Sequence, residues 1–371
     1  MLLSGLIMNK WIFAVQIKLQ GKCGVVGENR MEKIKLTDIC NPKQWKTIPT
    51  SELLENGYPV YGANGIIGYY SEFNHKNPVI TVTCRGATCG TINITVPKSY
   101  VTGNAMCLDD MRSDIYMEYL YYCLKHYNFN NVISGSAQPQ ITRQGMEKIY
   151  VTIGSHNEQM DIVDKLKKVE NVIGLRKREL KQLDTLVKSR FAEMFGDPIR
   201  NPKGWKVVTI GDIVTEVRYG TSKPAVEGGK YPYLRMNNLT ADGHLDLNDL
   251  KYIDISDDEV EKCVVRKGDV LFNRTNSIDL VGKTAVFDLQ DDMVIAGYII
   301  RVRLNEKILP EVLSQYMNLE ALKDILRSMA KGAVNQANIN AQELQSIRVY
   351  VPDIELQKQF VEMKDQVDKS K

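Results

Sequence analysis

The chain has 371 residues, of which 43% are hydrophobic and 25% charged, values that are ordinary for a globular protein. At roughly 150 residues per domain, this length predicts two domains. The net charge of +3 excludes a broad basic field, so a nucleic-acid partner would require locally focused basic residues. Seven cysteines with no C-x-x-C pair and only four histidines argue against a zinc site or a disulfide framework, and they favour the cytoplasm.

The first 30 residues have no counterpart elsewhere in the chain and are interpreted as an N-terminal extension. Their apolar run, residues 2–17, is interrupted by polar side chains and is shorter than the roughly 20 residues of a membrane span. It also lacks the basic start and small-residue cleavage site of a signal peptide. We therefore expect no membrane association. Met31 as the true start, or a short helix packed on the next module, are the two interpretations of this segment.

A long internal repeat dominates the rest of the sequence. "NPKQWK" from Asn41 and "NPKGWK" from Asn201 share five of six residues, at an offset of 160. Further matches follow in the same order, and the offset grows to 198. This pattern indicates one module copied in tandem, with insertions in the second copy, and the period is too long for a solenoid. The further matches are Tyr58-Pro59 with Tyr231-Pro232, Arg85 with Arg274, "EYLYYCL" with "EVLSQYM", and "QPQITRQGMEKIYV" with "QANINAQELQSIRV".

The first copy, residues 31–155, has the pattern of a mixed α+β domain. Residues 78–84 and 91–96 are rich in β-branched side chains and are predicted strands. Residues 113–127 are predicted to be a helix with Ser113 as its N-cap. A polar loop, "ISGSAQPQITRQG", and a strand at 149–153 complete the copy.

Residues 156–196 differ in kind, because apolar residues there follow a 3-4-3-4 spacing without proline. This spacing predicts one long heptad helix, ended by "GDP" at 196–198. A helix of this length requires a partner for its apolar stripe. The predicted seam consists of Leu166, Val169, Ile173, Leu180, Leu183, Val187 and Met194, with Arg176 and Arg190 at two of its positions.

The second copy, residues 197–352, repeats the order of elements. Residues 269–272, 282–287 and 293–304 are predicted strands. A helix is predicted from Leu309 to Lys331, with Pro310 in its first turn and Gly332 at its end. The polar loop "GAVNQANIN" and a strand at 346–351 follow.

Residues 353–371 begin a second copy of the heptad helix, in which Phe360 and Val367 take seam positions. The counterpart of Phe195 would be residue 393, so this copy is truncated by 22 residues relative to the first. We therefore expect the part of the first helix from Leu180 to Met194 to lack a partner within this chain.

No motif makes a case for catalysis. "VGKT" at 281–284 is similar to a phosphate-binding loop, but the required earlier glycine is Ser277 and the residues that follow have a strand pattern. There is no glycine-rich loop for S-adenosylmethionine and no Ser/His/Asp set. We expect neither catalytic residues nor a metal site.

Polar loops instead occupy matched places in the two copies. "SGSAQPQ" and "KGAVNQAN" precede the last strand of each copy, while "CRGATC" and "NRTNS" each follow a strand. Arg, Asn and Gln read base edges, while Lys, Ser and Thr suit phosphates. A solvated turn is the commoner role for any single residue, but the loops together favour DNA binding. The predicted DNA-binding residues are Tyr61, Asn64, Arg85, Ser136, Gln138, Gln140 and Arg143 in the first copy, and Arg218, Tyr219, Lys223, Arg235, Asn237, Asn238, Asn273, Arg274, Lys331, Asn335 and Gln336 in the second.

The phrases "GSAQPQI", "KGDVLFNRTNS", "VGKTAVF" and "LVKSRFAEMFGDP", with "NPKGW" opening the second copy, resemble the specificity subunit of Type I restriction–modification systems. The resemblance runs from about Glu32 to the C-terminus. It implies two target-recognition domains, at 31–155 and 197–352. It further implies that conserved helices at 156–196 and 353–371 form an antiparallel coiled coil with a pseudo-two-fold axis. The short second helix departs from that pattern.

The resemblance also implies a non-catalytic subunit that selects double-stranded DNA for its partners. The implied partners are two methyltransferase subunits and a restriction endonuclease subunit, which would carry S-adenosylmethionine and ATP, with no cofactor on this chain. Because the copies have diverged, we expect an asymmetric bipartite target at which the partners methylate adenine or cleave. The alternatives are the specificity part of a combined nuclease–methyltransferase and a protein-binding scaffold without DNA.

Overall fold

The computed structural model describes residues 31–135, 138–333 and 336–371, with residues 331–333 and 336 described by their backbone only. The N-terminal extension, 1–30, lies outside the described residues. The chain divides into two compact units, Met1–Leu175 and Arg176–Lys371. The division falls within the helix α5 (His156–Phe195), which confirms that one continuous helix follows the first copy.

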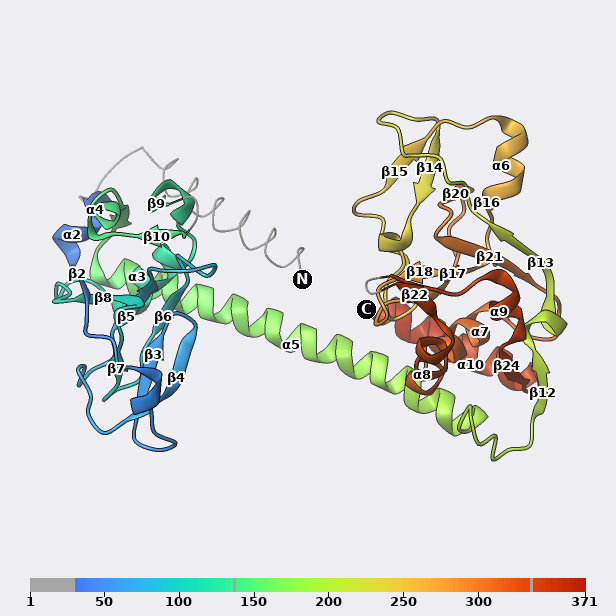
Figure 1. The fold of residues 1–371 in the computed structure, drawn as a ribbon, viewed down its shortest axis with the longest axis horizontal. Coiled ribbons are helices and arrows are strands. Elements are labelled where there is room, and N and C mark those ends of the chain that lie inside the picture. Colours follow the sequence, from blue (N-terminus) through green and yellow to red (C-terminus); the bar gives the residue numbers. More distant parts are fainter. Residues whose placement is uncertain (1–30, 136–137, 334–335) are drawn as a thin grey trace. The chain divides into compact units, whose positions relative to one another are not determined.

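The first unit is a mixed α+β fold of short strands and helices (Figure 1). Before α5, its elements are β1 (Glu32–Lys35), α2 (Leu36–Ile39), β2 (Asn41–Gln44), η1 (Thr50–Glu52), β3 (Tyr58–Gly62), β4 (Gly65–Tyr70), β5 (Ile80–Thr83), β6 (Ile92–Ile94), β7 (Tyr100–Val101), β8 (Ala105–Asp109), α3 (Met117–Lys125), η2 (Phe129–Asn131), β9 (Ile133–Ser134), β10 (Gln140–Ile141), α4 (Arg143–Met146) and β11 (Tyr150–Ile153).

The second unit gathers α7 to α10 on one side, while the sheet of β14, β15, β16 and β20 lies away from them (Figure 1). After α5, its elements are β12 (Lys206–Thr209), η3 (Ile210–Ile213), β13 (Val214–Tyr219), β14 (Tyr231–Leu234), η4 (Met236–Asn238), β15 (Lys251–Ile253), α6 (Asp257–Cys263), β16 (Val264–Val265), β17 (Val270–Asn273), β18 (Thr275–Asn276), β19 (Thr284–Val286), β20 (Met293–Ile295), β21 (Ile299–Leu304), α7 (Pro310–Met317), α8 (Glu320–Met329), β22 (Lys331–Ala333), β23 (Gln336–Asn338), α9 (Ala341–Ser346), β24 (Arg348–Val351) and α10 (Ile354–Ser370).

The strand pairing of the two units confirms the tandem repeat. The first unit has a sheet of order β2-β8-β5-β6, and the second has the same arrangement as β13-β21-β17-β19. In both units the first strand pairs antiparallel with the last, as β1 with β11 and β12 with β24. Each unit also contains one parallel pair, β3 with β7 and β14 with β20. The shared topology therefore includes the order of strands and their directions.

The strand register corrects one match by a single residue. The N–H of Ile141 donates to the carbonyl of Cys84, and the N–H of Ile339 donates to the carbonyl of Arg274. Ile141 and Ile339 are counterparts in the sequence repeat, so the structural counterpart of Arg274 is Cys84 and not Arg85. The predicted match of Arg85 with Arg274 is off by one residue. Insertions in the turns of the second copy change the offset between the copies, so matching identical residues does not fix the register.

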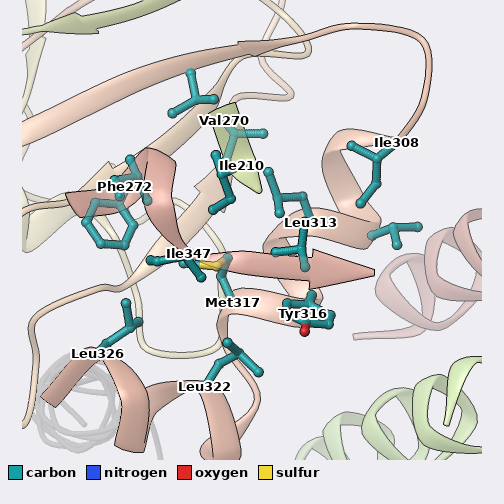
Figure 2. Packing of buried hydrophobic residues seen from close by; sticks show 14 of the residues in the cluster. Ile210, Val270, Phe272, Ile308, Leu313, Tyr316, Met317, Leu322, Leu326 and Ile347 are labelled. Carbon is teal, nitrogen blue, oxygen red and sulfur yellow. The ribbon is translucent and has the colours of Figure 1, made fainter. Parts of the chain in front are cut away.

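Each unit has its own hydrophobic core. In the first, strand and helix residues such as Ile80, Met106 and Leu120 are fully buried around the sheet. In the second, the main core includes side chains of β17, α7 and α8 (Figure 2). Figure 2 shows Phe272, Leu313 and Leu326 among the residues that converge there. A separate cluster of the second unit lies around β14, β16 and β20.

Most of the predicted strands are confirmed, but two helix predictions are corrected. The strands at 78–84, 91–96, 149–153, 269–272, 282–287 and 346–351 correspond to β5, β6, β11, β17, β19 and β24. The run at 293–304 forms two strands, β20 and β21, because Gly297 lies in a turn between them. The helix expected from Leu309 to Lys331 is broken into α7 and α8, since the Asn318 side chain bonds to the Thr284 carbonyl of a neighbouring strand.

The polar loops also contain more structure than expected. Residues 331–333 form β22, so Gly332 lies in a strand and does not end a helix.

The predicted helix of the first unit, α3, begins at Met117, and Ser113 is not its N-cap. Its start is set instead by Gln159 of α5, whose Oε1 accepts from the Tyr116 N–H at 2.7 Å.

This glutamine contact is repeated in the second unit. Gln357 Oε1 accepts from the N–H of Leu309, just before α7, at 2.8 Å. The Nε2 of Gln159 donates to the carbonyls of Asp114 and Gly154, and that of Gln357 to the carbonyls of Lys307 and Pro352. Both side chains are buried. Each of these two contacts, named here the glutamine clamps, fixes a heptad helix to the helix and strand of its own module.

Within the second unit, α10 packs antiparallel on the C-terminal part of α5. Phe191 and Phe195 meet Phe360 edge to face, at centroid distances of 5.2 and 5.5 Å, while Arg176 donates to the carbonyl of Ser370. The expectation that the part of α5 from Leu180 to Met194 lacks a partner in this chain is therefore wrong. Antiparallel packing places the start of α10 against the end of α5.

The buried stripe at this end of α5 also departs from the predicted seam. Val187, Phe360 and Val367 are buried, and Leu183 and Met194 pack against the same core. The fully buried positions Phe191 and Phe195 were not assigned to the seam, whereas Arg190 pairs with Glu193 at the surface. Leu166 packs on the first core, and Val169, Ile173 and Leu180 are half-buried. In the described part of the chain, no helix is long and apolar enough to cross a membrane.

Candidate nucleic-acid interface

In the first unit, the structure brings together two of the predicted polar loops. Arg85 follows β5 and forms an isolated antiparallel bridge with Gln140, and the N–H of Gly86 donates to the Pro139 carbonyl at 3.2 Å. Asn64, in the β3–β4 turn, accepts a hydrogen bond from Thr88 of the same loop at 2.5 Å. The side chains of Asn64, Arg85 and Gln140 are exposed. They therefore form one accessible polar surface.

The other predicted residues of this unit have different positions. Gln138 and Arg143 are exposed next to that surface, and Ser136 lies outside the described residues. Tyr61 is only 7% exposed, and its hydroxyl accepts from the Val96 N–H. This corrects the assignment of Tyr61 as a direct DNA contact, because its ring belongs to a small core beneath β8 and its hydroxyl already has a partner.

In the second unit, Arg274 is the residue around which the predicted site is organised. Its guanidinium carbon lies 4.9 Å from the centre of the Tyr219 ring, in cation–π geometry. The Tyr219 hydroxyl accepts from the Ala341 N–H, which joins β13 to the segment after β23. Arg274 Nη1 makes one long contact to the Gly297 carbonyl, at 3.4 Å, and Nε has no hydrogen-bond partner among the described residues. The stacked ring therefore orients a guanidinium whose donors are largely unused.

Asn273, beside it, has a structural role. The side chain is fully buried, and its Nδ2 donates to the carbonyls of Thr275 and Tyr298. Its Oδ1 accepts from Asn276. All of this corrects the prediction that Asn273 contacts DNA, because its hydrogen-bonding groups shape the loop that presents Arg274.

Three further basic residues predicted from the sequence have a carboxylate neighbour. Each carboxylate offsets part of the charge, so the attraction of the pair for a phosphate is weaker than that of an unpaired cation, although Glu216 is shared with Arg301 and Arg303 and Asp249 with Lys251. The Lys223 ammonium holds the pKa of Glu259 below its usual range. The pairs are Arg218–Glu216, Lys223–Glu259 and Arg235–Asp249.

The turn η4 carries two predicted residues with opposite outcomes. Asn237 is exposed. Asn238 is 2% exposed and bonds to the Arg235 N–H and the Asp246 carbonyl, which corrects its assignment as a DNA contact. Lys283, of the "VGKT" stretch, donates to the carbonyls of Met236 and Leu239, and burial lowers its pKa. This lysine therefore pins η4, and the strand β19 that follows it confirms that the stretch is no phosphate-binding loop.

A few predicted residues lie outside the described part of the chain, and one residue beside Arg274 was not predicted from the sequence. Asn335 falls between the described ranges, and the side chains of Lys331 and Gln336 are likewise outside them. Tyr298 is 48% exposed and adjoins Arg274, whose N–H donates to the Tyr298 carbonyl. Tyr298 was not predicted because it lies in an apolar run that has the pattern of one strand. Gly297, which favours a turn, was the one sequence feature that could have indicated an exposed position.

The arrangement suits recognition of a polar ligand. Unlike Arg218 and Arg235, the residues Arg85, Arg143 and Arg274 form no ion pair with a carboxylate among the described side chains. An unpaired guanidinium beside amide and hydroxyl groups can bind guanine edges or phosphates. These surfaces have the side-chain composition of loops that read DNA.

The family model of the type I restriction modification DNA specificity domain matches the chain twice, over residues 28–185 and 202–371. The chain therefore belongs to the type I restriction–modification DNA specificity family. Its two modules are two copies of that family's domain.

Individual relatives agree with this assignment. The chain is 30% identical over 171 residues to a Methanocaldococcus jannaschii protein assigned as the specificity subunit of the type I restriction enzyme MjaX, with 45% of this chain and 40% of that protein aligned. It is 24% identical over 273 residues to the specificity subunit of the type I restriction enzyme EcoKI from Escherichia coli K12, covering 68% of this chain and 59% of that protein. The matches thus span less than two thirds of these curated relatives.

A solved structure supports the fold over a greater length. The crystal structure of a type I restriction–modification S subunit from M. genitalium superposes with a TM-score of 0.55. The match covers 94% of this chain and 92% of that chain, at 15% sequence identity. At this identity the likeness concerns the fold.

Proposed function

We propose that this protein is the DNA sequence-recognition subunit of a Type I restriction–modification complex. Each module reads one half of an asymmetric bipartite target in double-stranded DNA. The subunit itself performs no catalysis and selects the site at which partner subunits methylate adenine or cleave.

The observation that carries this proposal is the contrast between topology and loop chemistry. The two modules share strand order and register, yet their matched loop positions hold different side chains. Cys84 in the first corresponds to Arg274 in the second, and Arg85 corresponds to Thr275. A common scaffold with divergent polar loops suits two related readings of a duplex, whose grooves present different donor and acceptor patterns for different bases.

The partners follow from membership of the family. We infer two methyltransferase subunits and a restriction endonuclease subunit, and these partners bind S-adenosylmethionine and ATP, so that this chain needs no cofactor for DNA recognition. The antiparallel contact between α5 and α10 supports a coiled coil with pseudo-two-fold symmetry. We infer that the protein is located in the cytoplasm, where the DNA is.

Comparing the methylomes of cells with and without this gene tests the function and reveals the target. The expected result is one asymmetric motif of two short half-sites that loses adenine methylation when the gene is absent. An unchanged methylome, together with no salt-sensitive DNA binding by the purified subunit and its methyltransferase, would favour a protein scaffold and contradict the proposal.

A further inference from the structure

A cluster of metal-binding side chains lies in the first unit, away from the polar loops described above. Cys107 and Asp109 are two residues apart on β8, and side chains at that spacing point to the same face of a strand. His75 reaches them from the segment after β4, which is bridged to Ser99. A ring nitrogen of His75, Cys107 Sγ and a carboxylate oxygen of Asp109 all lie within 4.8 Å of one another.

The surroundings fix two of these side chains in place. Trp45 Nε1 donates to Asp109 Oδ2 at 3.0 Å, which leaves Oδ1 directed at His75. Cys107 is fully buried, in a small apolar core against which Trp45 packs. An apolar shell with hydrogen bonds to the outer ligand atoms is the usual environment of a protein metal site.

The hydrogen bonds of Asn74 decide which nitrogen of His75 carries a proton. Asn74 Nδ2 donates to the Val101 carbonyl, and its Oδ1 accepts from the Val101 N–H, so the amide orientation is fixed. His75 Nδ1 lies 2.7 Å from that Oδ1 and must donate to it. Nε2 then faces Asp109 Oδ1 at 3.0 Å. At this distance either a proton on Nε2 or a metal ion bound by both atoms satisfies the contact.

The second unit offers an independent comparison at the same place in the fold. Cys107 and Asp109 correspond in register to Arg301 and Arg303 of β21. Arg301 is 1% exposed, so the second module buries one covalently attached cation at the position of Cys107, while the Arg303 side chain is 29% exposed. The first module has a thiol and a carboxylate at these positions. The partners of the two guanidinium groups are Glu216 and Asp269.

We propose that His75, Cys107 and Asp109 form a zinc site, with the imidazole Nε2, the thiolate and one carboxylate oxygen as ligands. One nitrogen, one sulfur and one oxygen ligand, with a fourth position for water, are a set that zinc accepts. Ligands at about 2.0–2.3 Å from one zinc ion stand roughly 3–4 Å apart, so small side-chain rotations close the set. The thiolate and carboxylate balance the two positive charges of the ion.

Such a site would be structural, joining the segment that contains His75 to β8. Zinc takes the cysteine as thiolate, so binding releases the thiol proton to solvent. The sequence argued against zinc because it contains no C-x-x-C pair. A histidine and two strand residues at alternate positions form no local motif, and the fold alone brings them together.

Cobalt(II) titration of the full chain, after treatment with a chelator, tests the proposal. The expected result is a thiolate-to-cobalt charge-transfer band together with the visible bands of tetrahedral cobalt, displaced by zinc. Cys107→Ser should abolish the charge-transfer band, whereas Cys40→Ser, a buried cysteine of the same unit, should leave it intact. No such band in the unmodified protein, or a band that persists in Cys107→Ser, would overturn the zinc site.

Two further variants keep the test decisive if Cys107→Ser does not fold. Asp109→Asn and His75→Gln retain Cys107 and should weaken cobalt binding by at least about tenfold while the band remains detectable at high cobalt. Proton release on metal binding, measured by calorimetry in buffers of different ionisation enthalpy, should accompany each titration. Unchanged affinity in both variants would show that the cluster is an ordinary His–Asp ion pair beside a buried thiol.

Discussion

Arg274 differs from the other predicted basic residues of the second unit in what its guanidinium touches. Tyr219 lies beneath it, and none of the described carboxylates forms an ion pair with it. We predict that Arg274→Ala relaxes base preference in one half-site only, by about 1–3 kcal/mol, because that is the scale of a bidentate base contact. Competition binding with targets altered at single positions would measure this.

Arg218 supplies the control for that prediction. It adjoins Tyr219 but pairs with Glu216, so Arg218→Ala should change affinity little and alter no base preference. If Arg274→Ala weakened all sequences equally, Arg274 would contact a phosphate or support the fold.

The glutamine clamps lead to a prediction about stability. Gln357→Leu would leave the Leu309 N–H and the carbonyls of Lys307 and Pro352 without this partner. We expect a loss of about 3 kcal/mol of unfolding free energy, since each buried unsatisfied group costs about 1–3 kcal/mol and part of the loss is relieved by water. Chemical denaturation would measure it. Gln359→Leu, at an exposed neighbouring position, should have an effect within about 0.5 kcal/mol, and a comparable loss there would contradict the clamp.

Which polar residues of the loops are free could not be read from the sequence. Asn273 and Asn237 look alike in their polar surroundings, yet the first is fully buried and the second exposed. The difference arises because the Tyr298 carbonyl, on a turn distant in sequence, accepts from Asn273. Polar composition predicted the loops, but only the tertiary hydrogen bonds separate the residues that shape them from those that are accessible.

At the scale of elements, α10 is attached to the rest of its unit by charge as well as by its aromatic contacts. His244 lies 3.4 Å from Asp242 and 3.5 Å from Asp368 of α10. Asp242, and then Asp368, raise the pKa of His244 from 6.5 to about 9. Lys364 and Lys371 also face Asp368 and preserve its charge.

A raised histidine pKa stabilises the fold while the ring is charged. This contribution is complete below pH 6.5 and is lost as the pH rises through about 9. The side chain is more than a third exposed, so we expect a loss of only about 1 kcal/mol, after allowing for solvent screening. Thermal unfolding at pH 6.5 and pH 9 should show a decrease in the parent protein that His244→Gln reduces. An equal decrease in both proteins would assign the effect to other groups.

The elements themselves were predictable to different degrees. β5, β17 and α5 were found because β-branched runs and heptad spacing report local preferences. The start of α3 and the break between α7 and α8 were not found. Both depend on a side-chain hydrogen bond across the fold, from Gln159 and Asn318, and no local pattern encodes such a bond.

At the scale of the whole molecule, the two modules should act as independent readers. Arg85 and Arg274 belong to different compact units. We predict that Arg85→Ala alters one half-site of the target, that Arg274→Ala alters the other, and that the double variant shows the sum of both free-energy changes within about 0.5 kcal/mol. Binding measurements on a matrix of half-site variants would test this. A larger departure from additivity would mean that the modules communicate.

The glutamine clamps have a consequence for how such proteins can change. Each clamp ties a module to the helix that follows it through one side chain and three backbone groups, and backbone groups are present whatever the sequence. Recombination can therefore transfer a whole module if the exchanged segment starts before β1 or β12 and ends after the clamp glutamine. Such a segment carries both the glutamine and the backbone groups to which it bonds. A lineage could acquire a new DNA target in a single genetic exchange, because the contact between the new module and its helix is already formed by the clamp glutamine.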